Sequence, residues 1–126
     1  MKLDLEWVIL VTDHFSDSFN FYKNILGLPL KREAPKEHFA QFQLDNNYLA
    51  IYGRKEMEQL TSQKLGQAGG AIYAFGEVDD VDQTFKRLKR QGVNFIKPPQ
   101  TQPWGQRTAY FTDPDGHIWE IQKWIA

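Results

Sequence analysis

The sequence predicts an α+β fold built from two tandem βαβββ modules. One observation is that an alternating apolar run, a stretch with apolar residues at helical spacing and a glycine follow one another twice in the chain. A second is that three further extended runs follow each glycine, and the last two of them form a predicted hairpin. The third is the period. The breaks at Asp13 and Asp80, like the glycines Gly27 and Gly92, are separated by about half of the 126 residues.

The first module begins with a predicted strand over residues 5–11 and a break at residues 13–16. A helix follows, because apolar side chains recur at helical spacing until Gly27; they are Phe15, Phe19, Tyr22 and Leu26. Residues 28–32 are expected to be extended, and residues 39–44 and 48–52 to form the hairpin.

A polar segment, residues 53–70, separates the modules. Only Met57, Leu60 and Leu65 could anchor a helix in it, which predicts a linker with one short helix. Because neither module alone contains enough core, we treat the chain as a single domain, with module one at about residues 1–53, the linker at about 54–70 and module two at about 71–126.

The second module repeats the order. Residues 71–78 are a predicted strand, and Asp79 and Asp80 break it. The helix that follows is predicted from three apolar residues at helical spacing before Gly92; they are Val81, Phe85 and Leu88. Residues 93–97 are expected to be extended, and residues 108–112 and 117–121 to form the hairpin.

The second predicted hairpin places the carboxylate of Glu120 on one defined face of its sheet. Its connection, residues 113–116, contains an Asx-type side chain, a proline with a preset φ and a glycine, which together favour a tight turn. Side chains alternate across a strand. One face therefore carries Ile118, Glu120 and Gln122, and the other carries Trp119 and Ile121. Any chemistry would begin at Glu120.

Composition narrows the range of partners. A formal net charge of −1 and a pI near 6.3 give no electrostatic footprint for nucleic acid or an anionic membrane. The basic run at residues 86–90 has the helical spacing of a solvated outer face. The lack of cysteine excludes disulfides, thiolate metal sites and cysteine nucleophiles. With no signal-peptide pattern in residues 1–6 and no run of 18 apolar residues, we expect a soluble cytoplasmic protein that binds a small organic molecule.

Several motifs occur in register along nearly the whole chain. They are Val11-Thr-Asp13, Phe21-Tyr22 before Leu26-Gly27, Val78-Asp-Asp-Val-Asp82, and Asp113-Pro-Asp-Gly116 before Glu120. Together with the two βαβββ modules they resemble the vicinal-oxygen-chelate superfamily, which includes glyoxalases, bleomycin-resistance proteins, fosfomycin-modifying enzymes and extradiol dioxygenases. Within the superfamily, the chain resembles the small bleomycin-resistance-like members most. The resemblance implies half-barrel sheets around a cleft and a homodimer, and it is far less specific for function than for fold.

Metal-using members of this superfamily take ligands from the first and fourth strand of each module. Mapped onto this chain, those positions fall on Glu6, Ala50, Tyr73 (or Ala71) and Glu120. Only the two glutamates could bind a cation. The three histidines, His14, His38 and His117, fall in loops or at strand starts. The resemblance therefore implies no classical metal site, and a dioxygenase with two histidines and one carboxylate is not expected.

Glu6 and Glu120 would face each other across the cleft if their strands meet as in the family. Three accounts of the pair remain open. The two carboxylates could weakly hold Mg²⁺ or Mn²⁺, or they could share one proton and act as an acid and a base. In the third account Glu6 faces solvent or pairs with a nearby lysine or arginine, and Glu120 is a family remnant or a polar ligand contact. Arg107 is a candidate partner, and the sequence does not decide on which face it lies.

Strand alternation also predicts the lining of the cleft. In the first strand, Glu6, Val8 and Leu10 are expected on the face of Glu120, with Trp7, Ile9 and Val11 beneath the helices. The first hairpin should add Tyr48, Ala50, Tyr52, Phe39, Gln41 and Gln43 to the cleft face. An aromatic and amide-rich lining suits a planar or amphipathic ligand. The candidate ligand-binding residues are Tyr48, Tyr52, Tyr73, Trp104, Arg107 and Gln41.

Trp104 is included because it lies between Pro103 and Gly105, in a segment that cannot form regular structure. A similar Trp-Gly pair is frequent in bleomycin-resistance-like members. We therefore expect a protein that binds an organic, antibiotic-like molecule without a metal. The alternative is a glyoxalase-like lyase or isomerase in which Glu120 abstracts a proton and Glu6 assists, alone or with a weakly bound divalent cation.

Overall fold

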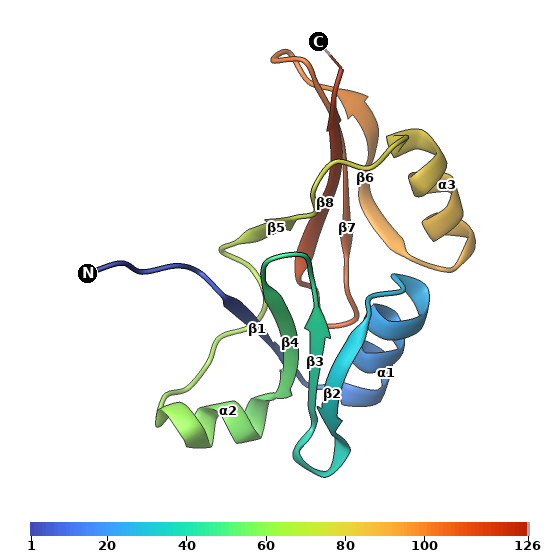
Figure 1. Cartoon of the computed structure of the whole chain (residues 1–126). Helices are drawn as coiled ribbons and strands as arrows, with labels where there is room; N and C mark the ends of the chain where they lie inside the picture. Colours follow the sequence, from blue (N-terminus) through green and yellow to red (C-terminus); the bar gives the residue numbers. More distant parts are fainter. Residues whose placement is uncertain (126) are drawn as a thin grey trace. The chain divides into compact units, whose positions relative to one another are not determined.

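The computed structural model describes residues 1–125. It divides into two compact units, unit 1 up to Gln67 and unit 2 from Ala68 onward. Each unit contains one four-stranded sheet, with α1 packed beside the sheet of unit 1 and α3 beside the sheet of unit 2 (Figure 1). The sheets are mixed and do not close into barrels. The prediction of an α+β fold with two βαβββ modules is confirmed.

Unit 1 has the strand order β1-β4-β3-β2. β1 pairs in parallel with β4, and β4, β3 and β2 are antiparallel neighbours. Its elements are β1 (Trp7–Thr12), α1 (Phe15–Asn20), η1 (Phe21–Ile25), β2 (Leu30–Ala34), η2 (Pro35–Glu37), β3 (Phe39–Gln43), β4 (Tyr48–Gly53) and α2 (Arg54–Thr61). α2 is the one short helix expected within the polar segment 53–70.

The helix predicted over residues 15–26 has two parts. After α1 the chain widens into the π-turn η1, in which the N–H of Leu26 bonds to the carbonyl of Phe21 at 2.9 Å. The wider turn buries the consecutive residues Phe21 and Tyr22. Gly27, with φ of 71°, then ends the helix in the left-handed region, as the glycine stop predicted.

The helical segments α1 and η1 cover the face of the unit 1 sheet that carries Phe42. The rings of Phe19 and Tyr22 lie 6.2 and 6.1 Å from that of Phe42. Register places Leu49 beside Phe42. The fully buried apolar core on this face consists of Leu10, Tyr22, Ala40, Phe42, Leu49 and Ile51.

The predicted orientation of the first strand is wrong. Trp7 and Ile9 pair with Tyr48 and Ala50, so they lie on the face opposite the helices, and they are 37% and 41% exposed. Leu10 instead faces the helices and is 2% exposed. Trp7, Ile9 and Val11 thus join the face predicted for Tyr48, Ala50 and Tyr52, whereas Val8 and Leu10 do not.

Unit 2 has the matching order β5-β8-β7-β6, with β5 parallel to β8 and the other pairs antiparallel. Its elements are β5 (Ile72–Ala74), α3 (Val81–Arg90), β6 (Asn94–Thr101), β7 (Gln106–Thr112) and β8 (Ile118–Trp124). β5 is shorter than the strand predicted at 71–78, and β6 is longer than the extended segment predicted at 93–97.

The core of unit 2 lies between its sheet and α3. The Asp80 side chain caps α3 by accepting a hydrogen bond from the N–H of Gln83 at 3.0 Å. Phe85 packs edge-on against Phe95, and Phe95 lies 5.4 Å from Phe111 between ring centroids. Trp119 and Ile121 are 4% and 2% exposed on this face. The predicted alternation along β8 is confirmed.

Candidate functional site

Each sheet has one face turned away from its helices, and we call these the first and second open faces. The first open face carries Trp7, Ile9, Val11, Phe39, Gln41, Gln43, Tyr48, Ala50 and Tyr52. The second carries Ile72, Ala74, Thr108, Tyr110, Thr112, Ile118, Glu120 and Gln122. They are the surfaces on which the predicted ligand residues are to be sought.

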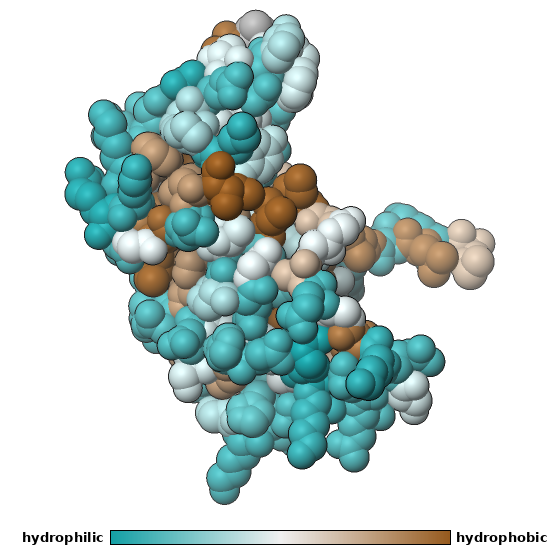
Figure 2. All heavy atoms as spheres, turned by 180° about the vertical axis from the view of Figure 1, so that it is seen from behind, coloured by the Kyte–Doolittle hydropathy of each residue, from teal (hydrophilic) through white to brown (hydrophobic). Residues whose placement is uncertain are grey.

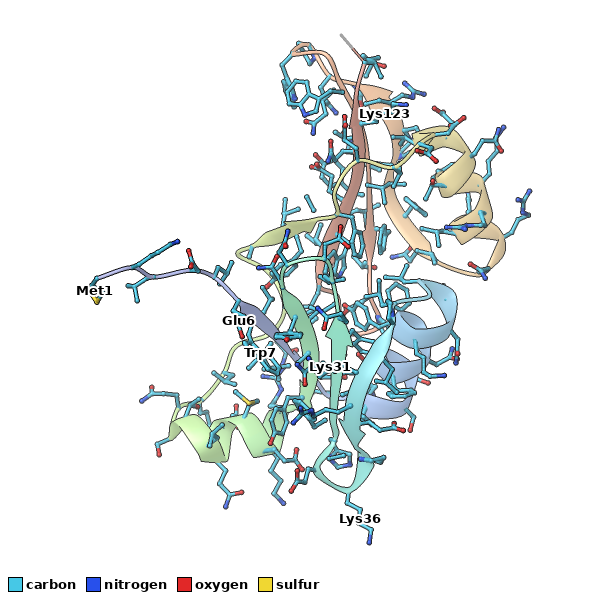
Figure 3. All side chains as sticks on the ribbon, viewed as in Figure 1. Met1, Glu6, Trp7, Lys31, Lys36 and Lys123 are labelled. Atoms are coloured by element: carbon cyan, nitrogen blue, oxygen red, sulfur yellow. The ribbon has the colours of Figure 1, made fainter. Side chains whose placement is uncertain are left out.

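Aromatic rings dominate the first open face. The rings of Trp7 and Tyr48 lie 4.9 Å apart, and those of Phe39 and Tyr52 lie 5.1 Å apart. Lys31 donates a hydrogen bond to the Tyr48 hydroxyl at 3.0 Å, and its ammonium lies 4.6 Å from the centre of that ring (Figure 3). The face offers flat apolar area with a positive charge at one edge.

Gln41 is the polar residue within this aromatic surface. It pairs with Ala50 across β3 and β4 and is only 2% exposed. Within residues 1–125, its side-chain oxygen has no hydrogen-bond partner. A buried acceptor without a donor is costly, so a donor from another molecule would be stabilised here once the neighbouring side chains move apart to admit it.

Glu120 lies on the second open face, half-buried, between Tyr110 of β7 and Ala74 of β5. Burial, and after it the hydrogen bond with the Glu120 carboxylate, raises the pKa of Tyr110 above 10.0. The Thr108 hydroxyl also bonds to Tyr110, which partly opposes the rise in pKa, and Gln102 donates to Thr108 at 2.9 Å. The phenol therefore keeps its proton at neutral pH and donates a hydrogen bond to the Glu120 side chain.

Sequence reasoning missed Tyr110. Alternation places Thr108, Tyr110 and Thr112 on one face, but a four-residue turn over residues 113–116 would set Ala109 opposite Glu120. In the structure Thr112 pairs with Ile118, and this register brings Tyr110 opposite Glu120.

Trp104 begins a second chain of hydrogen bonds at the end of the same sheet. Its indole N–H donates to Gln106 at 2.9 Å, Gln106 donates to Gln122 at 3.0 Å, and Gln122 donates to the carbonyl of Phe75 at 3.1 Å. Each amide is thereby held in one orientation. Trp104 is 58% exposed, so a fixed and accessible aromatic side chain stands beside the second open face.

Two predicted ligand residues lie on the helix face of unit 2 instead. Tyr73 pairs with Trp119, with the rings 5.3 Å apart, because Ile72 and Ala74 take the positions on the side of Glu120. Arg107 pairs with Lys123 and binds Asp82 of α3 through two hydrogen bonds of 2.6 and 2.8 Å. Neither of these candidates therefore lies on the face of Glu120, and a role of either residue in ligand binding stays a prediction.

Glu6 is exposed and precedes β1, and its carbonyl accepts the N–H of Tyr48 at 2.8 Å. It belongs to unit 1 and Glu120 to unit 2, so their meeting stays a prediction. The histidines take local roles. The backbone N–H groups of His14 and His117 bond to Thr12 and Asp113, and the His38 ring bonds to Glu56 at 3.0 Å.

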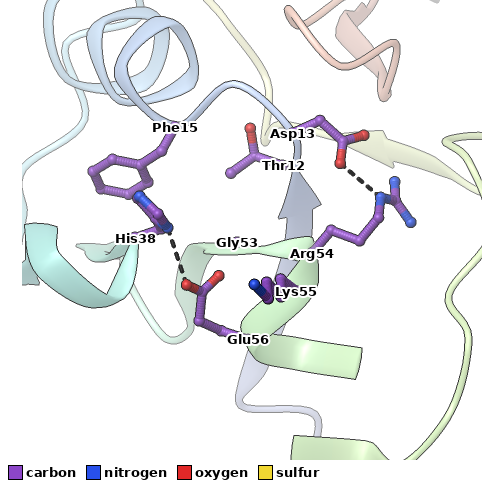
Figure 4. A pocket seen from close by; sticks show the side chains of 8 residues that line it. All are labelled: Thr12, Asp13, Phe15, His38, Gly53, Arg54, Lys55 and Glu56. Atoms are coloured by element: carbon purple, nitrogen blue, oxygen red, sulfur yellow. Dashed lines mark hydrogen bonds and ion pairs between the residues drawn. The ribbon is translucent and has the colours of Figure 1, made fainter. Parts of the chain in front are cut away.

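A small pocket of about 200 Å³ lies in unit 1 at the start of α2 (Figure 4). The His38–Glu56 pair lies on one of its sides and the Arg54–Asp13 pair, at 2.7 Å, on another. The pKa of Glu56 is lowered first by its own backbone N–H and then by His38. Its lining residues are Thr12, Asp13, Phe15, His38, Gly53, Arg54, Lys55 and Glu56. Opposite charges are already paired there, so the pocket is locally neutral.

The side chains that replace the family's metal ligands do not form a ligand set. Sheet register makes Ala50 the counterpart of Glu120, because each is the third residue of its strand and pairs with the third residue of a parallel neighbour, Ile9 or Ala74. By this register Ile9 and Ala74, and not Glu6 and Tyr73, lie beside Ala50 and Glu120. Three of the four side chains at these positions, those of Ile9, Ala50 and Ala74, are hydrocarbon. Nor does the described part of the chain contain a group of three or more His, Cys, Asp or Glu side chains placed to hold a metal.

Comparison with known proteins establishes the class. The model of the Glyoxalase/Bleomycin resistance protein/Dioxygenase superfamily matches residues 4–121. The chain belongs to this superfamily, the vicinal-oxygen-chelate superfamily. No helix within residues 1–125 is long and apolar enough to cross a membrane.

Relatives within the superfamily carry different names. The uncharacterized protein YraH of Bacillus subtilis is 32% identical, over 99% of this chain and all of its own length. A protein of Neisseria meningitidis named lactoylglutathione lyase is 30% identical, over 91% of this chain and 87% of its own length. The metallothiol transferase FosB of Staphylococcus saprophyticus is 27% identical, over 84% and 67%.

Solved structures agree on the fold. A glyoxalase/bleomycin resistance protein/dioxygenase from Nocardioides superimposes with a TM-score of 0.83 at 27% identity, over 99% of this chain and 85% of its own. A glyoxalase-related enzyme from Fulvimarina pelagi superimposes with a TM-score of 0.84 at 24% identity, over 94% and 86%. At these identities the likeness establishes the scaffold, which hosts several chemistries.

Proposed function

We propose that this protein binds a small, planar or amphipathic organic molecule without a metal, and that it acts by sequestration. The observation that carries the proposal is the chemistry of the two open faces. Aromatic rings and amides flank Ala50 and Glu120, the positions at which metal-binding members of the family are expected to carry a ligand. Such surfaces give apolar contact area together with a few polar groups that fix the orientation of a ligand.

The first open face supports the class of ligand. Trp7, Tyr48 and Tyr52 would contact a flat ring system, and Lys31 at the edge favours a ligand with an electron-rich or anionic group. The unpartnered oxygen of Gln41 favours a ligand that carries an N–H or O–H donor. In unit 2, Trp104 and Gln122 provide a further aromatic side chain and a further amide.

The test is a binding titration with and without a chelator. Bleomycin and the amphipathic dye 8-anilinonaphthalene-1-sulfonate are suitable probes, followed by tryptophan fluorescence and by calorimetry. We expect at least one probe to bind with the same dissociation constant in EDTA and in Mg²⁺ or Mn²⁺. Tyr48→Ala should weaken binding about tenfold or more, whereas Lys55→Ala, in the separate pocket, should leave it unchanged. A strict requirement for a divalent ion would overturn the proposal.

A second candidate is a lyase or isomerase in which Glu120 takes a proton from the substrate. The hydrogen bonds along Gln102, Thr108 and Tyr110 favour it, because they hold the carboxylate in one position on the open face. In an assay with lactoylglutathione, Glu120→Gln should abolish turnover and leave binding intact. Activity that survives this change ends the hypothesis. Glu6 would assist only if it reaches the same substrate, which Glu6→Gln tests.

We also propose a cytoplasmic homodimer. The cysteine-free composition fits a reducing compartment. The homodimer is proposed because small members of this superfamily usually form homodimers. Subcellular fractionation and sedimentation velocity test the two statements separately.

A further inference from the structure

Residues 1–6, the N-terminal arm, extend from the start of β1 and project away from the sheet of unit 1 (Figures 1 and 3). The arm alternates strictly between apolar and charged side chains. Its apolar residues are almost fully solvated: the exposed fractions of Met1, Leu3 and Leu5 are 111%, 82% and 74%. Figure 2 shows these apolar side chains on the projecting segment. An extended, alternating and exposed segment of this kind has the pattern of a strand that lacks a partner.

The backbone of the arm agrees with this description. At its base, the carbonyls of Leu5 and Glu6 accept hydrogen bonds from Asn47 and Tyr48 at 2.6 and 2.8 Å. Within the described residues, the backbone of Met1–Asp4 has no hydrogen-bond partner. β1, which the arm continues, is an edge strand of its sheet. The arm therefore carries a row of backbone donors and acceptors that another strand can satisfy.

The charges of the arm indicate what that strand is. When two copies pair antiparallel with Leu3 opposite Leu3, each Lys2 lies opposite Asp4 and each Met1 lies opposite Leu5. Every opposed pair is then either apolar or oppositely charged. Sliding one strand by two residues brings Asp4 opposite Asp4 in one direction and Lys2 opposite Lys2 in the other. Sliding it by four residues in the first direction brings Asp4 opposite Glu6. The arm is self-complementary in one register.

We propose that the N-terminal arms of two copies of this chain pair as antiparallel strands, with Leu3 opposite Leu3, and form an interface of the homodimer. This inference rests on the proposed homodimer and adds the surface that forms it. The contact is isologous, as a two-fold axis requires, and the Lys2–Asp4 pairs fix its register. Partner choice is thereby restricted to a second copy, since a neutral or wholly acidic strand would leave these charges unmatched.

Charge exchange tests the proposal in the full chain, with the dimer dissociation constant measured by sedimentation velocity at low salt. Lys2→Glu and Asp4→Lys each place two like charges opposite each other, so each variant should weaken the dimer about tenfold or more. The double variant restores opposite charges and should restore the dimer. An equimolar mixture of the two single variants should form a heterodimer, because each then supplies the charge that the other lacks.

Lys36→Glu is the matched control, because it makes the same change in net charge at an exposed lysine outside the arm (Figure 3). It should not alter the dissociation constant. A wild-type protein that stays monomeric at high micromolar concentration contradicts both the homodimer and the arm interface. A stable dimer that ignores the single charge reversals, or a double variant that is not rescued, contradicts the arm interface alone.

Discussion

The phenol of Tyr110 and the carboxylate of Glu120 lie opposite each other on β7 and β8 and are joined by a hydrogen bond. Burial is the larger cause of the raised pKa of Tyr110, and Glu120 is the next. The phenol therefore keeps its proton at neutral pH and donates a hydrogen bond to the Glu120 side chain. The pair is one of the hydrogen bonds that fix side chains on the open face of unit 2, together with the bond from Gln106 to Gln122.

We predict that Tyr110 titrates above its ordinary pKa of 10.0 and that Glu120→Gln moves the midpoint part of the way back. The protonated phenol is favoured in the folded state, so its contribution to stability is present below about pH 10 and is lost as pH rises beyond that. Ultraviolet difference absorbance of the tyrosinate reports the midpoint. Tyr110→Phe identifies the signal by removing it, and an unchanged midpoint in Glu120→Gln would disprove the coupling.

The Arg107–Asp82 pair predicts a dependence on acid. Asp82 has a lowered pKa, caused first by its hydrogen bond to Arg107, so its contribution to the free energy of unfolding is present above about pH 3.8 and is lost as pH falls through the lower folded value. Both side chains are partly solvated, which limits the effect to about 1 kcal/mol or less. Arg107→Met should cost that amount at pH 7 and less at pH 2.

Urea unfolding at the two pH values measures this difference. Arg90→Met, a change at another exposed arginine of unit 2, is the control and should leave the difference between the two pH values as in the wild type. Equal losses at pH 7 and pH 2 for Arg107→Met would show that the ion pair is not the cause.

Gly53 must be a glycine because of what surrounds it, and not because of its φ of −58°. A Cβ at this position would overlap the Glu56 carboxylate and lie 3.0 Å from the Cβ of His38. Gly53→Ala should therefore displace Glu56, break its bond to His38 and destabilise the protein by about 1–3 kcal/mol. Gly66→Ala is the control, because a Cβ there meets nothing within 4 Å. Thermal unfolding of both variants checks this, and equal melting temperatures would refute it.

The sequence was sufficient to predict which face of the sheet each side chain lies on where polar residues alternate with apolar ones along the strand. Glu120 and Gln122 alternate with apolar neighbours, so the orientation of β8 follows directly from the pattern, and the turn at Asp113–Gly116 fixes the hairpin. The first strand has no such marker, because residues 7–11 are apolar throughout. Its orientation depends on the pairing with β4, and alternation counted from Glu6 therefore assigned the wrong face.

Side chains held by distant residues could not be placed from the sequence. Arg107 is committed to Asp82, which lies 25 positions earlier on a helix, and no local pattern predicts that contact. Tyr73 lies in a strand of three residues, which is too short for the alternation of apolar and polar residues to show which face Tyr73 lies on. The face of Gln41 was predicted correctly, yet its burial and its unpartnered oxygen follow only from the packed sheet.

The side-chain oxygen of Gln41 should affect ligand affinity and folding stability in opposite directions. Because the Gln41 side-chain oxygen is buried without a donor, Gln41→Leu removes an unsatisfied polar atom and fills a similar volume. We expect the free energy of unfolding of the ligand-free protein to stay the same or to rise by about 1 kcal/mol. Affinity for any probe with an N–H or O–H donor should fall about tenfold, because the ligand's donor then meets a methyl group.

Indole and 1-methylindole form a matched pair of probes for this prediction, since they differ in a single donor. The wild-type protein should prefer indole, and Gln41→Leu should bind both equally. Gln43→Leu is the control, because Gln43 already donates to the carbonyl of Leu44 at 2.7 Å. Its loss should cost stability and leave the preference between the two probes intact. A preference for indole that persists in Gln41→Leu would show that the donor is recognised elsewhere, and a large loss of stability in that variant would show that the oxygen is satisfied within the folded chain.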